Sequence, residues 1–215
     1  MKSSRPQFLP SLLLSALLLL HLHTIRAVDS SLSFAPSVQP PASTGATDFI
    51  RTGCNSTLYP DLCYSSLSGY ASTIRQDPAQ LALVAISVTL SNARRMTTYV
   101  SNLSRQADYE ADTRAAAALH DCFSNFGDAV EEINGSLKQM RQLKSSSRSS
   151  FRFQMSNVQT WMSAALTDED TCTDGFEDVS DGPMKKDICD RVEYVKKLTS
   201  NALALVNRYA ETGTN

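Results

Sequence analysis

Five cysteines are the residues of this sequence best suited to chemistry, because thiols can form disulfides, bind a metal or stay reactive. A thiolate metal site is disfavoured, since no Cys-x-x-Cys pair occurs and His120 is the only histidine beyond residue 27. In a secreted chain disulfides are the expected state, and an odd number of cysteines leaves one thiol unpaired. The five positions are Cys54, Cys63, Cys122, Cys172 and Cys189.

The N-terminal segment has the three-part pattern of a secretory signal peptide. Lys2 and Arg5 precede a leucine-rich run, and Ala27 is a small residue suited to the position before a cleavage point. The run is short for a membrane span, so we predict that residues 1–27 are removed and that the mature protein has no membrane anchor. Removal takes away three basic residues and no acid, which changes the formal net charge from −2 to −5. This acidic balance argues against nucleic-acid binding.

The helices that must position the cysteines can be predicted from hydrophobic periodicity. Residues 28–47, rich in Ser, Pro, Ala and Thr, are predicted to be a disordered leader, and residues 48–212 a single domain. Asp77 and Pro78 have the pattern of a helix N-cap followed by the first helical residue. Beyond them apolar residues recur every three or four positions in four stripes, and only Glu169 interrupts the third. The stripes run over Ala79–Ala107, Ala115–Met140, Phe151–Phe176 and Ile188–Tyr209.

These stripes predict an all-α fold. Short polar loops join them and the alternation of period two that marks strands is missing, so residues 77–212 should form an up-down-up-down four-helix bundle. Residues 48–76 are predicted to form a helical hairpin that folds back at Tyr59-Pro60-Asp61 and is too small to be stable alone. Trp161, followed by the small residues Ser163 and Ala164, predicts a close helix crossing.

The helix phases favour one pairing of the cysteines. Cys54 and Cys63 flank a proline turn, so a bridge between them would brace the hairpin. Cys122 and Cys172 lie in phase with the stripes of the second and third helices, which adjacent antiparallel helices can bring together. The chain-entropy model gives about 3 kcal/mol for the short loop and about 4 kcal/mol for the long one. Cys189 would then be a buried free thiol. Pairing of Cys172 with Cys189 across the acidic loop stays open.

No reaction centre can be found in the sequence. It contains no G-x-S-x-G, no H-E-x-x-H and no phosphate-binding glycine loop, and no cofactor or metal is predicted. His120 and Asp121 are the one candidate catalytic pair, and they are read more simply as polar neighbours. A secreted, disulfide-linked bundle of this kind is predicted to be a binding protein and not an enzyme.

Three stretches resemble the landmarks of the plant invertase and pectin methylesterase inhibitor family. They are "CNSTLYPDLCYSSL" at 54–67, "ALHDCFSNFGDAVEEI" at 118–133 and "WMSAALTDEDTCTDGF" at 161–176, and the resemblance covers about residues 48–212. It implies a secreted four-helix bundle with an N-terminal helical hairpin. It also implies that the first two cysteines bridge the hairpin and that the next two join the second bundle helix to the third, in agreement with the favoured pairing.

The resemblance implies inhibition by occlusion. Pectin methylesterase inhibitors form a one-to-one complex with the plant enzyme and cover its pectin-binding cleft, whereas invertase inhibitors use the same scaffold against fructosidases. Similar domains also precede pectin methylesterase catalytic domains, but this sequence stops at Asn215, which predicts a free inhibitor. Invertase inhibitors tend to carry a Pro-Lys-Phe triplet that is absent here, so pectin methylesterase is the favoured target in the apoplast and cell wall. Invertase inhibition, and non-inhibitory binding of wall polysaccharide, are the alternatives.

Several surface residues are candidates for binding. Exposed positions of the second and third helices are expected to contact the enzyme, through Asp121, Asn125, Gln159 and Ser163. A basic stripe could hold anionic pectin, or it could simply complement a helix C-terminus; its members are Lys138, Arg141, Lys144, Arg148 and Arg152. An acidic block could steer the protein toward a basic enzyme, although its spacing does not fit an EF-hand; its members are Asp168, Glu169, Asp170, Asp174, Glu177, Asp178 and Asp181.

Three asparagines match the N-glycosylation pattern Asn-x-Ser/Thr. They are Asn55, Asn102 and Asn134. A glycan on Asn134, in the second bundle helix, would lie near the expected enzyme-binding face.

Overall fold

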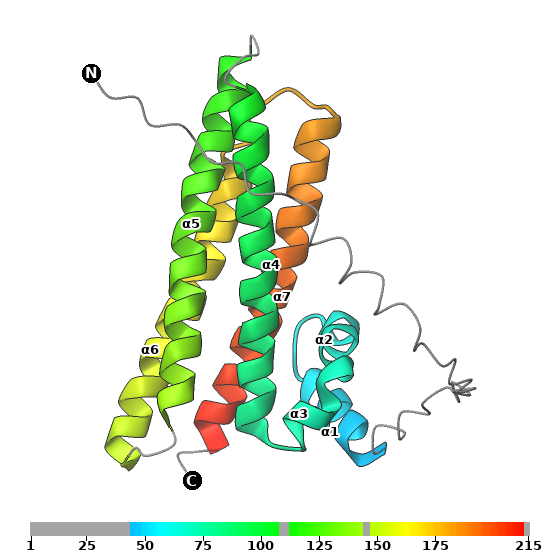
Figure 1. Ribbon diagram of the computed structural model, residues 1–215, viewed down its shortest axis with the longest axis vertical. Coiled ribbons are helices and arrows are strands. Elements are labelled where there is room, and N and C mark those ends of the chain that lie inside the picture. Colours follow the sequence, from blue (N-terminus) through cyan, green and yellow to red (C-terminus); the bar gives the residue numbers. More distant parts are fainter. Residues whose placement is uncertain (1–43, 108–111, 144–146, 213–215) are drawn as a thin grey trace, which may run out of the picture. The chain divides into compact units, whose positions relative to one another are not determined.

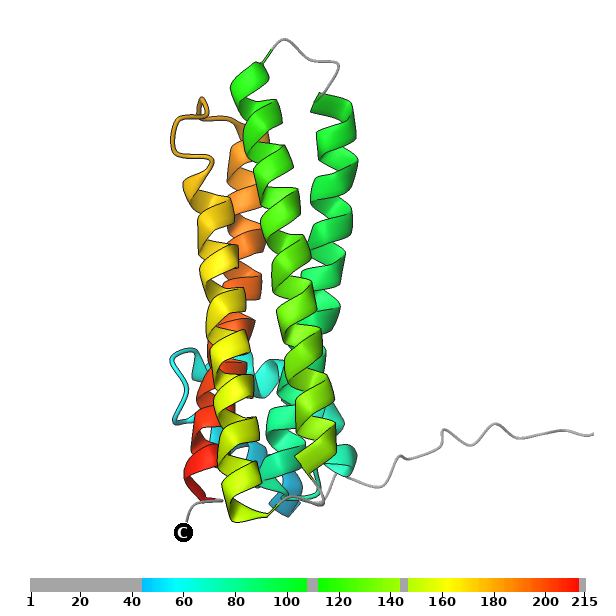
Figure 2. The ribbon, with the colours of Figure 1, turned by 90° about the vertical axis from the view of Figure 1, so that its left-hand side faces the viewer.

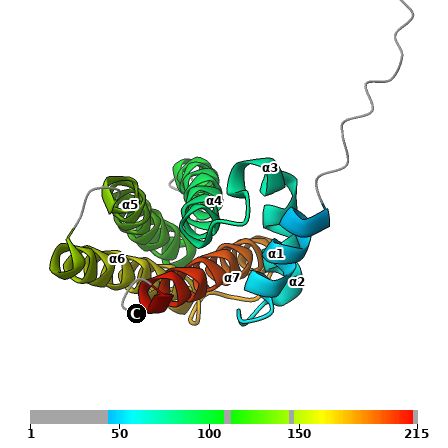
Figure 3. The same ribbon diagram turned by 90° about the horizontal axis from the view of Figure 1, so that it is seen from below.

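The described part of the chain folds as an all-helical bundle. The computed structural model describes residues 44–107, 112–143 and 147–212, and these residues contain no β-strand. Four long helices run alternately up and down (Figure 1). They are α4 (Pro78–Ala107), α5 (Thr113–Gln142), α6 (Arg148–Asp174) and α7 (Pro183–Thr212). Each packs against the next and α7 returns to pack against α4, which Figures 2 and 3 show from the side and from below. The predicted fold class is confirmed.

Local sequence signals explain where the long helices begin. The Asp77 carboxylate accepts a hydrogen bond from the Ala79 amide at 2.8 Å, directly before Pro78 at the start of α4. Asp112 caps α5 by accepting from the amides of Arg114 and Ala115, both at 3.1 Å. Such caps satisfy amides that have no partner within the helix.

The core is formed by the predicted apolar stripes. Each long helix buries residues three or four positions apart, and a fully buried Leu, Ile, Phe or Met side chain contributes about 1.5–3 kcal/mol. Members that are wholly buried include Ile86 and Val100 in α4, Leu119, Phe126 and Ile133 in α5, Val158 and Met162 in α6, and Ile188 and Val192 in α7.

The N-terminal hairpin consists of more pieces than the sequence predicted. Helix α1 (Thr44–Cys54) begins four residues before the expected boundary at Asp48, so this part of the predicted leader is helical. The returning arm is built from α2 (Pro60–Leu67), the short 3₁₀ helix η1 (Ser68–Tyr70) and α3 (Ala71–Ile74). The arm ends at two residues with left-handed φ, Arg75 (50°) and Gln76 (59°), which turn the chain into α4. The hairpin lies beside α4 and α7 (Figure 3).

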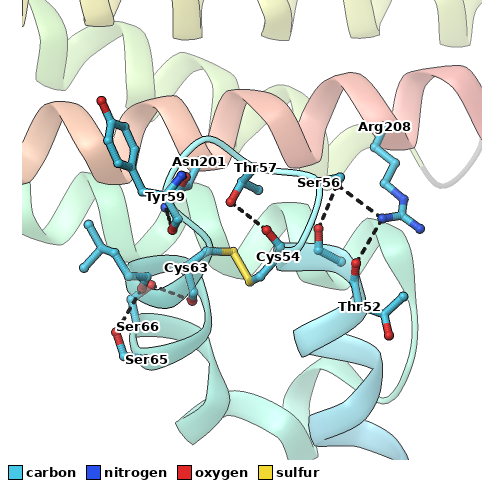
Figure 4. Close-up of a disulfide and its surroundings, with 12 residues drawn as sticks. Thr52, Cys54, Ser56, Thr57, Tyr59, Cys63, Ser65, Ser66, Asn201 and Arg208 are labelled. Carbon is cyan, nitrogen blue, oxygen red and sulfur yellow. Dashed lines mark hydrogen bonds between the residues drawn. A yellow bond between two sulfur atoms is a disulfide. The ribbon is translucent and has the colours of Figure 1, made fainter.

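A disulfide closes the hairpin, and one buried asparagine of α7 fastens it to the bundle (Figure 4). Cys54 is bonded to Cys63, and both side chains are buried. Asn201 of α7, 3% exposed, accepts from the Tyr59 amide at 3.1 Å and donates to the Tyr59 carbonyl at 2.9 Å. Arg208 donates to the carbonyl of Thr52 at 3.4 Å. These contacts supply the anchoring that a short hairpin lacks by itself.

The N-terminal predictions fall largely outside the described residues. The signal peptide at 1–27 lies wholly outside them, as does the leader up to residue 43. Within the described ranges, no helix is long and apolar enough to cross a membrane.

Candidate protein-binding face

The second disulfide joins the two helices that were expected to carry the binding face. Cys122 of α5 is bonded to Cys172 of α6, with 4.2 Å between their Cα atoms, and both side chains are buried. The open alternative, Cys172 with Cys189, is therefore not the pairing in the structure. Cys189 is a free thiol on α7, but it is half-buried and not fully buried as expected. Burial is the main reason that its pKa is raised.

One side of α5 presents a polar stripe beside α6. Asp121, Asn125, Asp128 and Glu132 follow one another at steps of four, three and four residues, which places them on one side of the helix. Asp121 and Asp128 are exposed, whereas Asn125 and Glu132 are half-buried. We call the surface formed by this stripe and the facing part of α6 the α5–α6 face. Asp128 and Glu132 were not among the residues predicted to contact the enzyme. Their spacing from Asp121 and Asn125 nevertheless indicates that they lie on the same side of the helix.

Two carboxyl groups meet across the α5–α6 face. The pKa of Glu132 is raised to about 7, mainly by burial and then by the charge of the neighbouring Asp168 of α6 and a hydrogen bond with it; Asp128 adds a smaller effect. The pKa of Asp168 is also raised, mainly by burial. The hydrogen bond favours the proton on Glu132. The face therefore carries less negative charge in mildly acidic solution than above neutral pH.

The four predicted contact residues do not form a single cluster. Asp121 lies next to the Cys122–Cys172 bridge. Gln159 follows Val158, whose carbonyl accepts from the Ser136 hydroxyl at 3.4 Å, so Gln159 lies at the level of Ser136 along the bundle. At 1.5 Å per residue along α5 the two ends are roughly 22 Å apart. Asn125 sits one turn from Asp121, and Ser163 is exposed on α6 one turn from Gln159.

Gln159 was expected to be an exposed contact residue, but its side chain is directed toward α7. Its side-chain amide donates to Asn207 of α7 at 2.9 Å, and it is half-buried. It therefore lies at the α6–α7 junction and does not point into the α5–α6 face. Sequence periodicity placed Gln159 on the correct helix, but it could not tell which neighbouring helix the side chain would meet.

Trp161 fills the close approach of α5 and α6. A Cβ atom at Gly135 would lie 3.4 Å from Cε3 of the Trp161 ring, so the absence of a side chain at Gly135 makes room for the indole. The sequence predicted a close helix crossing at Trp161. It did not identify Gly135 as the residue on the other helix.

Replacement of Gly135 tests this contact. Gly135→Ala should stabilise the protein by up to about 1 kcal/mol, because alanine is the better helix former and the 3.4 Å contact is tolerable. Gly135→Leu should destabilise it by about 1–3 kcal/mol by displacing the indole. Trp161 is the only tryptophan in the sequence, so its fluorescence should shift to longer wavelength in Gly135→Leu.

Gly127, on the same helix, is the matched control. A Cβ at Gly127 would meet nothing within 4 Å, so both Gly127→Ala and Gly127→Leu should leave the emission unchanged. An unchanged emission in Gly135→Leu would contradict the close approach.

The predicted acidic block is dispersed by the fold. Glu169 points into the core and has no exposed surface, and Asp168 faces Glu132. Asp170 pairs with Lys196 of α7. The remaining acids flank the turn between α6 and α7, where they are exposed; they are Asp174, Glu177, Asp178 and Asp181. Among the described residues, no group of three or more His, Cys, Asp or Glu side chains could hold a metal ion.

The other predicted surface residues are accessible. His120 and Asp121 are both exposed, as are the glycosylation candidates Asn55, Asn102 and Asn134. In the basic stripe Lys144 lies outside the described residues, and the exposed members are Lys138, Arg141, Arg148 and Arg152.

The fold and this face define a class: a disulfide-linked helical bundle that presents a polar surface along two joined helices. Comparison with known proteins identifies the family. The model of the plant invertase/pectin methylesterase inhibitor family matches residues 48–205, and the chain belongs to that family.

Relatives with similar sequences include Pectinesterase inhibitor 10 of Arabidopsis thaliana, 44% identical over 170 residues. The match covers 78% of this chain and 53% of that relative, so the chain spans about half of its length. The 21 kDa protein of Daucus carota is 42% identical over 166 residues, which cover 77% of this chain and 85% of the relative. Among solved structures, a mutant form of a pectin methylesterase inhibitor from Arabidopsis matches with a TM-score of 0.59 at 19% identity. The structural match covers 74% of this chain and 95% of the solved chain, and it shows that the two share a fold.

Proposed function

We propose that this protein inhibits a plant pectin methylesterase by forming a one-to-one complex that covers the pectin-binding cleft of the enzyme. The observation that carries the proposal is the family match across residues 48–205, together with relatives named pectinesterase inhibitor at 34–44% identity. In this proposal the α5–α6 face makes the contact. The protein is an enzyme inhibitor that performs no reaction of its own and needs no cofactor.

Features of the α5–α6 face support its role as the contact surface. Its two helices are held in register by the buried Cys122–Cys172 bridge, so the face is rigid before binding and loses little conformational entropy.

The protein is proposed to act outside the cell, in the apoplast or cell wall. The signal-peptide pattern at 1–27 and the two disulfides support secretion. Glycans on the exposed Asn55, Asn102 or Asn134 would be compatible with this location.

A titration of enzyme activity tests the proposal. The purified mature protein is added to a pectin methylesterase and, separately, to an acid invertase, from mildly acidic to neutral pH. Loss of esterase activity that reaches completion at one equivalent is expected. If both enzymes kept their activity, the inhibitor proposal would be refuted. If only the invertase lost activity, the protein would be an invertase inhibitor, the alternative within the same family.

Two sets of variants locate the contact. Asp121→Arg should weaken esterase inhibition about tenfold or more if the α5–α6 face is used, because it reverses a charge within the interface. The matched control is Glu177→Arg, an exposed acid outside that face, which should inhibit normally.

Binding to demethylated pectin tests the polysaccharide alternative. Polysaccharide binding through the basic stripe would be supported if the protein is retained on demethylated pectin and this retention disappears when Arg141, Lys144 and Arg148 are changed to Ala.

A further inference from the structure

A groove between α4 and α7 lies on the opposite side of the bundle from the α5–α6 face. It has a cavity volume of about 410 Å³, within the roughly 300–1,000 Å³ range of small-ligand sites. Met96 and Val195, both nearly buried, contribute apolar surface to the groove. Since α4 and α7 pack against each other, and α5 packs against α6 across the bundle, a ligand here would leave the α5–α6 face free (Figure 3).

The α7 side of the groove holds a guanidinium group in a fixed position. Arg191 donates through its Nε to Asp187 at 2.8 Å, and its Cζ lies 4.4 Å from the centroid of the Tyr99 ring of α4. The Tyr99 hydroxyl donates to the same Asp187 carboxylate. An arginine fixed by an acid and an aromatic ring still has N–H groups for a ligand, and little entropy is lost when it binds.

The α4 side supplies a second guanidinium group. Arg95 donates to the side-chain oxygen of Asn92 at 2.6 Å, and it forms no ion pair with the described residues. The two carboxylates of the groove are already engaged: Asp187 by Arg191 and Tyr99, and Asp190 by Lys186 at 2.5 Å. Arg95 is therefore the cation whose charge is available to an anionic ligand.

An exposed aromatic ring completes the groove. Tyr194 of α7 is 46% exposed and lines the same cavity. A small inorganic anion would leave the Tyr194 ring uncovered, and an apolar ligand would leave the charge of Arg95 without an opposite charge. A sugar ring that bears a carboxylate suits both features. Its C–H face can pack on an aromatic ring, its carboxylate can pair with a guanidinium group, and its hydroxyls can hydrogen-bond with polar lining residues such as Asn92 and Asp190.

We propose that the α4–α7 groove binds an acidic saccharide, with Arg95 pairing with the carboxylate of a uronic acid residue and Tyr194 packing against its ring. The choice of galacturonate as that uronic acid rests on the proposed function, which places the protein at pectin. The groove would let the inhibitor stay on the polymer while its α5–α6 face holds the enzyme.

Direct binding without enzyme tests the proposal and keeps it separate from inhibition. The mature protein is titrated with trigalacturonate, with its fully methyl-esterified form and with a neutral galactose trisaccharide, by calorimetry and by amide NMR shifts. Trigalacturonate should bind with shifts around Arg95 and Tyr194, and both uncharged sugars should bind at least about tenfold more weakly, because they lack the charged partner of Arg95. Equal binding of all three sugars, or binding of none, would overturn the proposal.

Matched variants locate the site. Arg95→Gln should weaken trigalacturonate binding about tenfold, and Tyr194→Leu should weaken it severalfold. The controls are Arg94→Gln, the exposed neighbour on α4 that does not line the groove, and Tyr70→Leu, a tyrosine with the same 46% exposure in η1. Both controls should bind normally. An equal loss in Arg94→Gln would show only general charge attraction and would refute the site. Esterase inhibition should be unchanged in Arg95→Gln, so failure of the groove and failure of the inhibitor proposal give different results.

Discussion

Glu169→Gln is expected to make the protein more stable than the wild type at pH 8 and to remove most of the fall in stability between pH 5 and 8. Glu169 has no exposed surface. One of its oxygens accepts from the Thr199 hydroxyl of α7 at 2.8 Å, and the buried Oε2 has no hydrogen-bond partner within the described residues. Burial therefore raises the pKa of Glu169 to about 8, against the opposing effects of Thr199 and Lys196.

The sign of the pH effect follows from linkage. The unfolded chain releases the Glu169 proton near its ordinary pKa of 4.5, whereas the native protein holds it up to about 8. Stability is thus fully present below the lower value and is lost as pH rises toward the upper one. Because one pKa unit corresponds to about 1.4 kcal/mol, the full loss is of the order of 5 kcal/mol. At pH 5 the variant should be about 1 kcal/mol less stable, since the amide adds a donor without a partner.

Urea unfolding of both proteins at several pH values measures this effect. Glu177→Gln, an exposed acid from the same predicted block, is the control and should follow the wild-type curve. The Glu132–Asp168 pair should preserve a smaller pH dependence in every variant. If the curves of Glu169→Gln and the wild type ran parallel from pH 5 to 8, Glu169 would not be a protonated core residue.

Loss of the Cys122–Cys172 bridge should destabilise the whole bundle. This bridge closes a sequence separation of 50 residues and lies between α5 and α6. In the chain-entropy model its removal costs about 4 kcal/mol, a large fraction of the stability of a domain this size. The double variant Cys122→Ala/Cys172→Ala should therefore unfold at a much lower urea concentration, with all helices lost in one transition.

The hairpin bridge provides the comparison. Cys63 follows Cys54 at a sequence separation of 9, for which the same model gives about 3 kcal/mol. Cys54→Ala/Cys63→Ala should mainly loosen α1 and α2, detected as faster amide exchange there, while the bundle keeps most of its stability. Cys189→Ala, which breaks no bridge, is the control. The Cys122–Cys172 bridge would not be the one that stabilises the whole bundle if Cys54→Ala/Cys63→Ala lowered the free energy of unfolding more than Cys122→Ala/Cys172→Ala.

Much of the fold could be predicted because its signals are local. The stripe period predicted four long helices, and the cap at Asp77 and Pro78 located the start of α4. The same phases favoured the partner that Cys172 has in the structure, because a residue in phase with a buried stripe must face a neighbouring helix. The hairpin was less predictable: its pieces are short, and their geometry depends on contacts such as that of Asn201 with Tyr59, 142 residues apart in sequence.

The sequence by itself determined the helices, the up-down-up-down order and the favoured cysteine pairing, since each depends on spacing along one chain. Only the tertiary structure decided what each polar side chain meets. Glu169 and Asp168 are adjacent in one acidic run, yet one lies in the core against Thr199 and the other faces Glu132. Gln159 turned toward α7, and Arg95 and Tyr194 came together in one groove. Periodicity gives the angle of a residue around its own helix, whereas its partners depend on how far that helix is rotated against its neighbours.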